Sequence, residues 1–324
     1  MKVKNPSFFR GGLGRVLLQW LNLRPDECDR TLLMFIVYTT TSVGLLWLEA
    51  STVALFLENI GASQLPWIYI SSAGLGIFLG FVTGWMQKNL PLRQFIVIVA
   101  ILIAAPLLLF RLGLQNLDTE TASLATTFTV AQLTVFLMPL WVDVSYALNQ
   151  LNTSLTANQL FNIREIKRTF PLISSGVLVA DVLSGFSLPF LLKLIGLPNV
   201  ILAASCMMLL GAGIVFYMSR RYPQAFPASP QKDLEDSLND ARTRRLKGPL
   251  QQYALLLLGF FFLAQVLVLL IDFQFQTQLQ LKFEGKEEQI ASFLALFSGM
   301  IGLCELVTQW FVSGRAIERM GVFR

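Results

Sequence analysis

The segment SRRYPQAFPASPQKDLEDSLNDARTRRLKGP (residues 219–249) is the longest interior stretch of this chain that is not hydrophobic. It is rich in arginine, lysine and proline and has an acidic patch at Asp233, Glu235 and Asp236. Six apolar blocks precede it and two follow it. This pattern predicts a cytoplasmic linker between the two halves of a polytopic membrane protein. A disordered connection with no further role is the alternative interpretation for most of the segment.

Composition places the chain in a lipid bilayer. Only 14% of its 324 residues are charged and 54% are hydrophobic, whereas soluble domains carry about 25% charged residues. The net charge of +5 comes from basic clusters between apolar blocks, where such clusters orient helices, so no nucleic-acid partner is expected. Histidine is absent, the cysteines lack metal-site spacing, and no P-loop or nucleophile motif is present. We therefore expect neither an enzyme nor a bound cofactor or metal.

Eight apolar blocks each have about the 20 residues that a helix needs to cross the hydrocarbon core. The predicted spans are residues 31–56, 65–86, 94–112, 122–147, 170–192, 197–218, 250–271 and 290–312. Pro66, Pro198 and Pro249 stand at the start of three of them, where the first turn of a helix tolerates proline. The predicted fold class is an all-α polytopic membrane protein. Residues 1–30 form a cytoplasmic N-terminal segment with an amphipathic run at 16–23.

The basic residues predict the orientation. With the N-terminus inside, 21 of the 25 lysines and arginines fall on the cytoplasmic side. The four on the outside are Arg111, Lys193, Lys282 and Lys286. Because cytoplasmic loops carry the excess of positive charge, the prediction is a multi-pass protein of the plasma (inner) membrane with a cytoplasmic N-terminus.

Two similar loops indicate an internal repeat. Residues 83–93 and 313–324 each begin with a small residue and glycine and continue into a short basic turn ending in arginine. The parallel suggests that residues 31–218 are a first six-helix half and 250–324 the first two helices of an incomplete second half. This predicts a protein of about twelve spans, of which eight are visible; a natural eight-span protein is the alternative.

Five acids lie within the predicted spans, and each costs roughly 2.5–3.5 kcal/mol if it is charged near the bilayer centre. They are Glu49, Asp143, Asp181, Asp272 and Glu305. Such residues are expected to face a cavity, a partner or a water path. We expect a polar cavity between helices that binds a solute; structural polar contacts or positions near helix ends are the alternative for any one acid.

Further polar residues extend this predicted pathway. Helical spacing places Gln132 and Pro139 on the face of Asp143. Residues 272–282 alternate like a strand, but an exposed strand edge cannot lie in lipid, so a helix is expected with Asp272, Gln276 and Gln280 on one stripe that lines the cavity. The alternative is that this run is only the hydrated outer end of the seventh span.

Three glycines at a spacing of four residues predict close helix packing rather than chemistry. Gly76, Gly80 and Gly84 lie in the second predicted span. Small residues at this spacing allow another helix to approach closely.

The stretch REIKRTFPLISSG (164–176) resembles the cytoplasmic entry to the fifth helix of the ATP/ADP translocase-like nucleotide transporters, which are distant relatives of the major facilitator superfamily. Residues 55–66 and 271–321 are similar to other parts of that group. The resemblance implies a twelve-helix carrier that alternates access between two halves and exchanges nucleotides by antiport. It also implies functional acids in the fourth and eighth helices, which Asp143 and Glu305 match best.

The chain departs from that family in two ways. Its nucleotide-carrying members have lysines within the bundle to hold phosphates, and the spans before the linker show no such buried base. Ser174 and Ser175 also stand where glycines are usual. A neutral or cationic solute therefore fits the visible charges better than a nucleotide.

These observations predict a secondary transporter of the major facilitator type with an acid-lined central cavity. The solute is a nucleotide or another small metabolite, with coupling to a proton or cation through Asp143, Asp272 or Glu305. The alternative is a non-transporting membrane anchor, sensor or assembly protein derived from a carrier fold. Uptake into liposomes separates the two.

Overall fold

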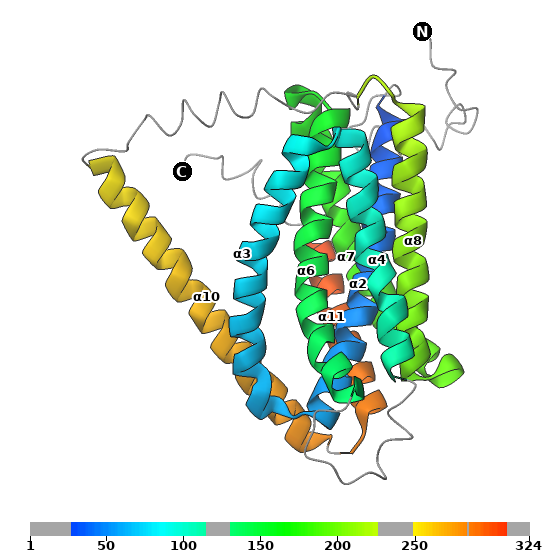
Figure 1. Cartoon of the computed structure of the whole chain (residues 1–324), viewed down its shortest axis with the longest axis vertical. Coiled ribbons are helices and arrows are strands. Elements are labelled where there is room, and N and C mark those ends of the chain that lie inside the picture. The colour runs from blue at the N-terminus through cyan, green and yellow to red at the C-terminus, as the bar shows by residue number, and fades with distance from the viewer. Residues whose placement is uncertain (1–26, 115–129, 226–248, 284, 310–324) are drawn as a thin grey trace.

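The computed structural model describes residues 27–114, 130–225, 249–283 and 285–309, and these residues form helices joined by short connections (Figure 1). Eight of the helices are long and apolar enough to cross a membrane. The described helices are α2 (Cys28–Asn59), η2 (Ala62–Gln64), α3 (Leu65–Asn89), α4 (Leu92–Leu114), α6 (Val130–Leu160), α7 (Ile163–Ile195), α8 (Leu197–Arg221), α10 (Pro249–Lys282) and α11 (Glu287–Val307). The all-helical, multi-pass prediction is confirmed for this part of the chain.

Two helix boundaries lie far from the predicted ends of the spans, and several others differ by two or three residues. Helix α6 continues to Leu160, well past the predicted end of the span at 147. Helix α7 begins at Ile163, before the predicted 170, because Asn162 and Glu165 form a capping box there. In that box the Asn162 backbone N–H donates to Glu165 Oε2 at 2.9 Å. Hydropathy detects only the apolar part of such a helix, whereas its polar first turn is set by capping.

The strand-like run after residue 271 is helical, as predicted, because α10 continues without a break to Lys282. The predicted linker at 219–249 overlaps the ends of α8 and α10 by a few residues. Its centre (226–248), the amphipathic run 16–23 and the second repeat loop 313–324 lie outside the described residues. The prediction of two halves therefore stays a prediction.

Helix α2 is the centre of the bundle. It packs against α6, α7, α8 and α11, and half of the residues in its most apolar 18-residue stretch are buried inside the protein. Its Met34, Leu48 and Phe56 are fully buried. Helix α4 completes the core by packing against α6 and α8. Helix α2 is therefore surrounded by other helices. A carboxylate on it, such as Glu49, needs a polar partner or a cavity.

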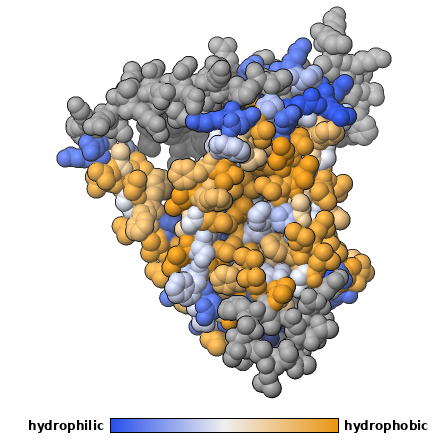
Figure 2. Space-filling model, viewed as in Figure 1, coloured by the Kyte–Doolittle hydropathy of each residue, from blue (hydrophilic) through white to orange (hydrophobic). Residues whose placement is uncertain are grey.

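Helices α3 and α10 carry an exposed apolar surface. No residue in the most apolar 18-residue stretch of α10 is buried. Phe260, Phe261 and Phe262 are each more than 60% exposed. Figure 2 shows a broad hydrophobic region across the middle of the molecule with hydrophilic residues at its margin. A helix that is apolar all round belongs in lipid or against another apolar surface. This surface is the expected one for a bilayer-embedded protein.

The described connections gather at two ends of the bundle. At one end, here called the Arg30 end, the Arg30 side chain donates to the Leu160 carbonyl at 2.7 Å and pairs with Glu165 at 3.6 Å. At the other, the Gln280 end, Gln280 Nε2 donates to the Leu57 carbonyl at 2.8 Å. Successive helices therefore run between the two ends, as alternating membrane crossings require (Figure 1).

Candidate functional site

Two adjoining pockets lie between the helices before residue 226 and those after residue 248. Their volumes are about 80 Å³ and about 130 Å³. Both are lined by Glu49 and Val53 from α2 and by Asp272 and Gln276 from α10. The smaller pocket extends toward α7 and α11, and the larger one toward α3 and α6. We call the two pockets together the acidic chamber.

Glu49 enters the chamber from α2 and is fixed by a residue of α6. The Tyr146 hydroxyl donates to Glu49 Oε2 at 2.5 Å. Glu49 is exposed although its neighbours Leu48 and Ala50 are buried, because its side chain faces the chamber rather than the packed core. A tyrosine hydroxyl orients the carboxylate while leaving its other oxygen able to accept a donor.

Asp143 reaches the chamber from α6. The Ser72 hydroxyl of α3 donates to Asp143 Oδ2 at 2.5 Å. Pro139, one turn earlier on α6, also lines the larger pocket. A proline inside a helix removes one backbone hydrogen bond and frees a carbonyl, so this part of α6 is more polar than its composition alone indicates.

Asp272 enters from α10 and has two donors. The Tyr69 hydroxyl of α3 donates to Asp272 Oδ2 at 2.7 Å, and Gln276 Nε2 donates to the same oxygen at 2.8 Å. The second bond joins positions i and i+4 on one face of α10. The Asp272 and Gln276 stripe predicted from the sequence is therefore the face that α10 turns toward the chamber.

The chamber is electronegative. Glu49 is close enough to interact electrostatically with both Asp143 and Asp272, and Asp143 with Asp272. No lysine or arginine is found among the described residues that line either pocket. When ionised, these carboxylates are surrounded by apolar walls that screen them less than water does, so their field is concentrated in the chamber.

The other two predicted acids lie toward α7 and α11. The Asp181 side chain packs directly over Gly302 of α11, and Asp181 interacts electrostatically with both Glu49 and Glu305. Glu305 lines a separate, open depression of about 380 Å³ with Cys304 and Thr308. The structure therefore brings Glu49, Asp143 and Asp272 together around one chamber, and neither Asp181 nor Glu305 is among the residues that line it.

Gln132 is exposed on α6 and lines neither pocket of the chamber. It shares the helical face of Asp143 but lies about three turns nearer the start of α6. A common helical face does not imply a common depth, and the place of Gln132 in a solute pathway stays a prediction.

The three glycines predicted to pack a second helix have open space in front of them. A Cβ atom built on Gly76, Gly80 or Gly84 would have no atom of the described chain within 4 Å. No described helix therefore uses this face of α3 for close packing. The predicted contact stays a prediction for a surface outside the described residues.

The close glycine crossing is instead between α7 and α11. A Cβ atom on Gly185 would overlap the Cα atom of Gly299 and lie 2.6 Å from the Ala295 carbonyl oxygen. Sequence reasoning missed this pair, although Ala291, Ala295 and Gly299 have the small-residue spacing of four within α11. At this crossing the backbones of a helix before residue 226 and a helix after residue 248 come into direct contact.

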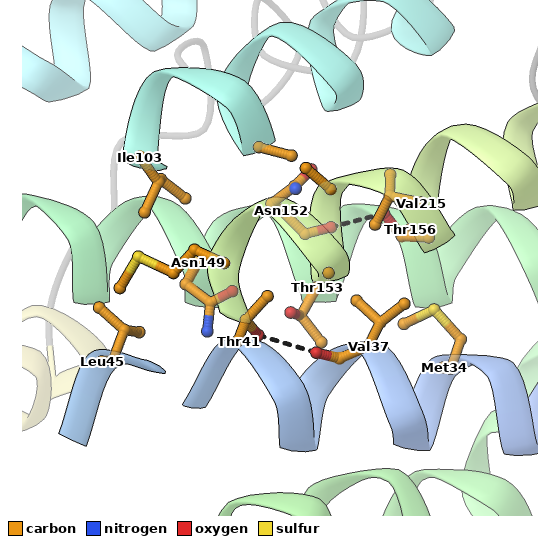
Figure 3. A pocket seen from close by; sticks show the side chains of 14 residues that line it. Met34, Val37, Thr41, Leu45, Ile103, Asn149, Asn152, Thr153, Thr156 and Val215 are labelled. Carbon is orange, nitrogen blue, oxygen red and sulfur yellow. Dashed lines mark hydrogen bonds between the residues drawn. The ribbon is translucent and has the colours of Figure 1, made fainter. Parts of the chain in front are cut away.

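A second polar pocket, also missed from the sequence, lies nearer the Arg30 end among α2, α4, α6 and α8 (Figure 3). Asn149, Asn152, Thr153 and Thr156 line it from one face of α6, at the spacing i, i+3, i+4 and i+7 that could have revealed it. Its volume is about 20 Å³, which is the space that one water molecule needs. It is too small for a metabolite.

Comparison with protein families, with curated proteins and with solved structures finds no match to this chain. The acidic chamber itself is therefore the basis for inferring function.

Proposed function

We propose that the chain belongs to a secondary transporter of the facilitator type, in which the acidic chamber binds a small solute and opens in turn to either side of the membrane. The membrane is the plasma (inner) membrane, with the N-terminus in the cytoplasm as the basic residues predict. The observation that carries the proposal is the position of the chamber. Its carboxylates come from α2 and α6 on one side of the linker and from α10 on the other.

The cost of these carboxylates supports a functional role. Glu49, Asp143 and Asp272 lie within apolar helices, where acids are rare and mark substrate or ion paths. A protein that served only as an anchor would have no need for three of them around two adjoining pockets. The alternative of a non-transporting anchor or sensor is therefore the weaker of the two.

The contacts between the two parts of the chain support movement around the chamber. At the Gln280 end, α10 is fastened to the corner after α2 by Gln280, and Glu58 accepts a bond from the Gly285 backbone N–H at 3.2 Å. Toward its start, α10 is exposed along residues 251–258. Helix α10 is thus fastened at one end and free of the described helices at the other, while α11 packs along α7 and α2. A helix attached in this way is able to move relative to the chamber, as alternating access requires.

The lining also bears on coupling and solute. Protonation of Asp143 or Asp272 would change the charge of the chamber, so we propose these two as candidate coupling sites and set Glu305 aside because it lies outside. The resemblance to nucleotide carriers implies a phosphate-bearing solute, and the described lining offers no base to hold phosphate. A nucleotide is therefore a poorer fit to the chamber than a neutral or cationic solute.

Uptake into proteoliposomes tests the proposal. The full chain is reconstituted and offered amines, sugars, carboxylates and nucleotides, each with and without a pH gradient. At least one class is expected to accumulate, and Asp143→Asn is expected to reduce its uptake by roughly tenfold or more, as loss of one charged contact implies. Glu305→Gln is the matched control and keeps uptake. Correctly folded protein that accumulates none of these classes would refute transport.

A further inference from the structure

We propose that the acidic chamber binds a small organic cation with a primary ammonium or guanidinium group, and that Gln276 contributes a neutral acceptor to it. Movement of this cation across the membrane rests on the proposed transport function, whereas its binding in the chamber does not. The inference names the class of solute and a residue that recognises it.

The charged side chains of the chamber are all acceptors. Glu49, Asp143 and Asp272 each accept hydrogen bonds on one carboxylate oxygen within the described part of the chain. An ionised carboxylate offers about four lone-pair positions, so each retains acceptor capacity. An occupant of this space gains most if it brings several N–H donors and positive charge.

Gln276 points to the same conclusion without relying on charge. Its side chain is only 8% exposed, and its Nε2 is used in the bond to Asp272. Its Oε1 is buried and receives no hydrogen bond within the described part of the chain. A buried acceptor without a donor costs about 1–3 kcal/mol. Because Gln276 lines both pockets, its amide group lies beside the space in which a donor would be held.

The remaining walls fit the carbon part of such a solute. Tyr69 lines the larger pocket and Phe275 the smaller one, and Phe275 stacks on Phe297 with ring centroids 5.5 Å apart. Leu188 and Ala295 complete an apolar wall on the smaller pocket. Aromatic rings attract cations, and guanidinium groups in particular stack on them.

The spacing of the acids favours an organic cation over a bare metal ion. In the described residues no three acidic or sulfur groups are close enough to hold one metal. Each carboxylate is instead held by its own donor on a different helix. Three separated acceptors match a molecule with several N–H groups better than a single point charge. An anion would meet three carboxylates and no described basic residue.

Binding is tested on the purified full chain in detergent by thermal unfolding and titration calorimetry. The probes are methylammonium, guanidinium, putrescine and agmatine, with sodium, potassium, succinate and AMP for comparison. We expect the amines or guanidines to stabilise the protein and Asp272→Asn to weaken their binding roughly tenfold or more. Stabilisation by the metal ions alone, by the anions alone, or by none of the probes overturns the inference.

Two substitutions separate recognition by Gln276 from its support of Asp272. Gln276→Leu removes both polar atoms and is expected to weaken amine binding about fivefold or more. Gln276→Glu keeps an acceptor but loses the donor to Asp272, and is expected to retain binding. Equal loss in both variants would show that Gln276 acts only through Asp272. Gln278→Leu, an exposed glutamine of the same helix, is the control.

Uptake measured in parallel distinguishes the two proposals. Amine binding without amine uptake removes the transport function and leaves this inference standing. Uptake of a sugar or carboxylate without amine binding has the opposite consequence.

Discussion

At the scale of single residues, the chamber is organised by pairs in which a hydroxyl from one helix holds a carboxylate of another. Tyr146 holds Glu49, Ser72 holds Asp143 and Tyr69 holds Asp272. Each pair satisfies an expensive group in an apolar bundle and fixes its direction at the same time.

The pair of Tyr146 and Glu49 should be measurable by a double-mutant cycle. We expect Tyr146→Phe and Glu49→Gln to be coupled by about 1–2 kcal/mol, since the hydrogen bond at 2.5 Å involves an acid in a poorly screened site. Unfolding of the four proteins in mixed micelles gives the coupling. Additive effects of the two substitutions would mean that the bond contributes nothing.

Gly185 and Gly80 give opposite expectations for the same substitution. Gly185→Ala places a methyl group against Gly299 and the Ala295 carbonyl, and overpacking of this kind costs roughly 1–3 kcal/mol. Gly80→Ala meets open space and should leave stability unchanged or slightly higher. Thermal unfolding of both variants checks this. A destabilising Gly80→Ala would instead reveal a helix packed on α3.

At the scale of helices, α10 is attached mainly through its last turns. Gln280 Oε1 accepts from the Ala62 backbone N–H at 2.8 Å while its Nε2 donates to the Leu57 carbonyl. One side chain therefore fixes the end of α10 to the corner between α2 and η2.

Gln280→Leu should loosen this attachment without unfolding the bundle. Loss of its two bonds leaves a backbone donor and acceptor unpaired, at a cost of roughly 1–3 kcal/mol. Hydrogen–deuterium exchange at Ala62 is expected to rise, with exchange in the buried middle of α2 unaffected. The control is Gln278→Leu, which should leave the Ala62 amide protected; equal exchange in the two variants would contradict the assignment.

The helices show what local sequence could and could not predict. The number of described spans, the proline starts and the helical nature of 272–282 follow from hydropathy, from the fixed φ of proline and from the exclusion of strand edges from lipid. The early start of α7 does not follow from hydropathy, because it depends on the capping pair Asn162 and Glu165, a separate local signal in the sequence. Capping boxes are short and easily missed beside an apolar block.

The candidate site divides in the same way. Acids in apolar spans can be picked out one at a time, so Glu49, Asp143 and Asp272 are visible in the sequence. Their hydroxyl partners and the crossing of Gly185 with Gly299 are not, since both depend on which helices become neighbours. The position of a side chain along the helix axis relative to neighbouring helices also cannot be read from the sequence. Gln132 and Glu305, both predicted for the cavity, line neither pocket of the chamber.

At the scale of the whole molecule, orientation is a prediction from charge. Ser63 is exposed at the Gln280 end and Asn89 at the other end of α3. With the three native cysteines replaced by serine, Ser63→Cys should react with an impermeant maleimide added outside intact cells. Asn89→Cys should react only after the membrane is opened. The reverse pattern would invert the topology, while the helix arrangement would be unaffected.

The crossing of α7 and α11 has a mechanical consequence. Where Gly185 meets Gly299, main chain touches main chain, and neither partner has a rotamer to change. Helices whose side chains interlock must repack before they slip past one another. The two glycines have no side chain to repack, whereas the Asp181 side chain over Gly302, about one turn along α11, would have to move. The glycine crossing is therefore a point about which the two helices can tilt with little repacking of side chains.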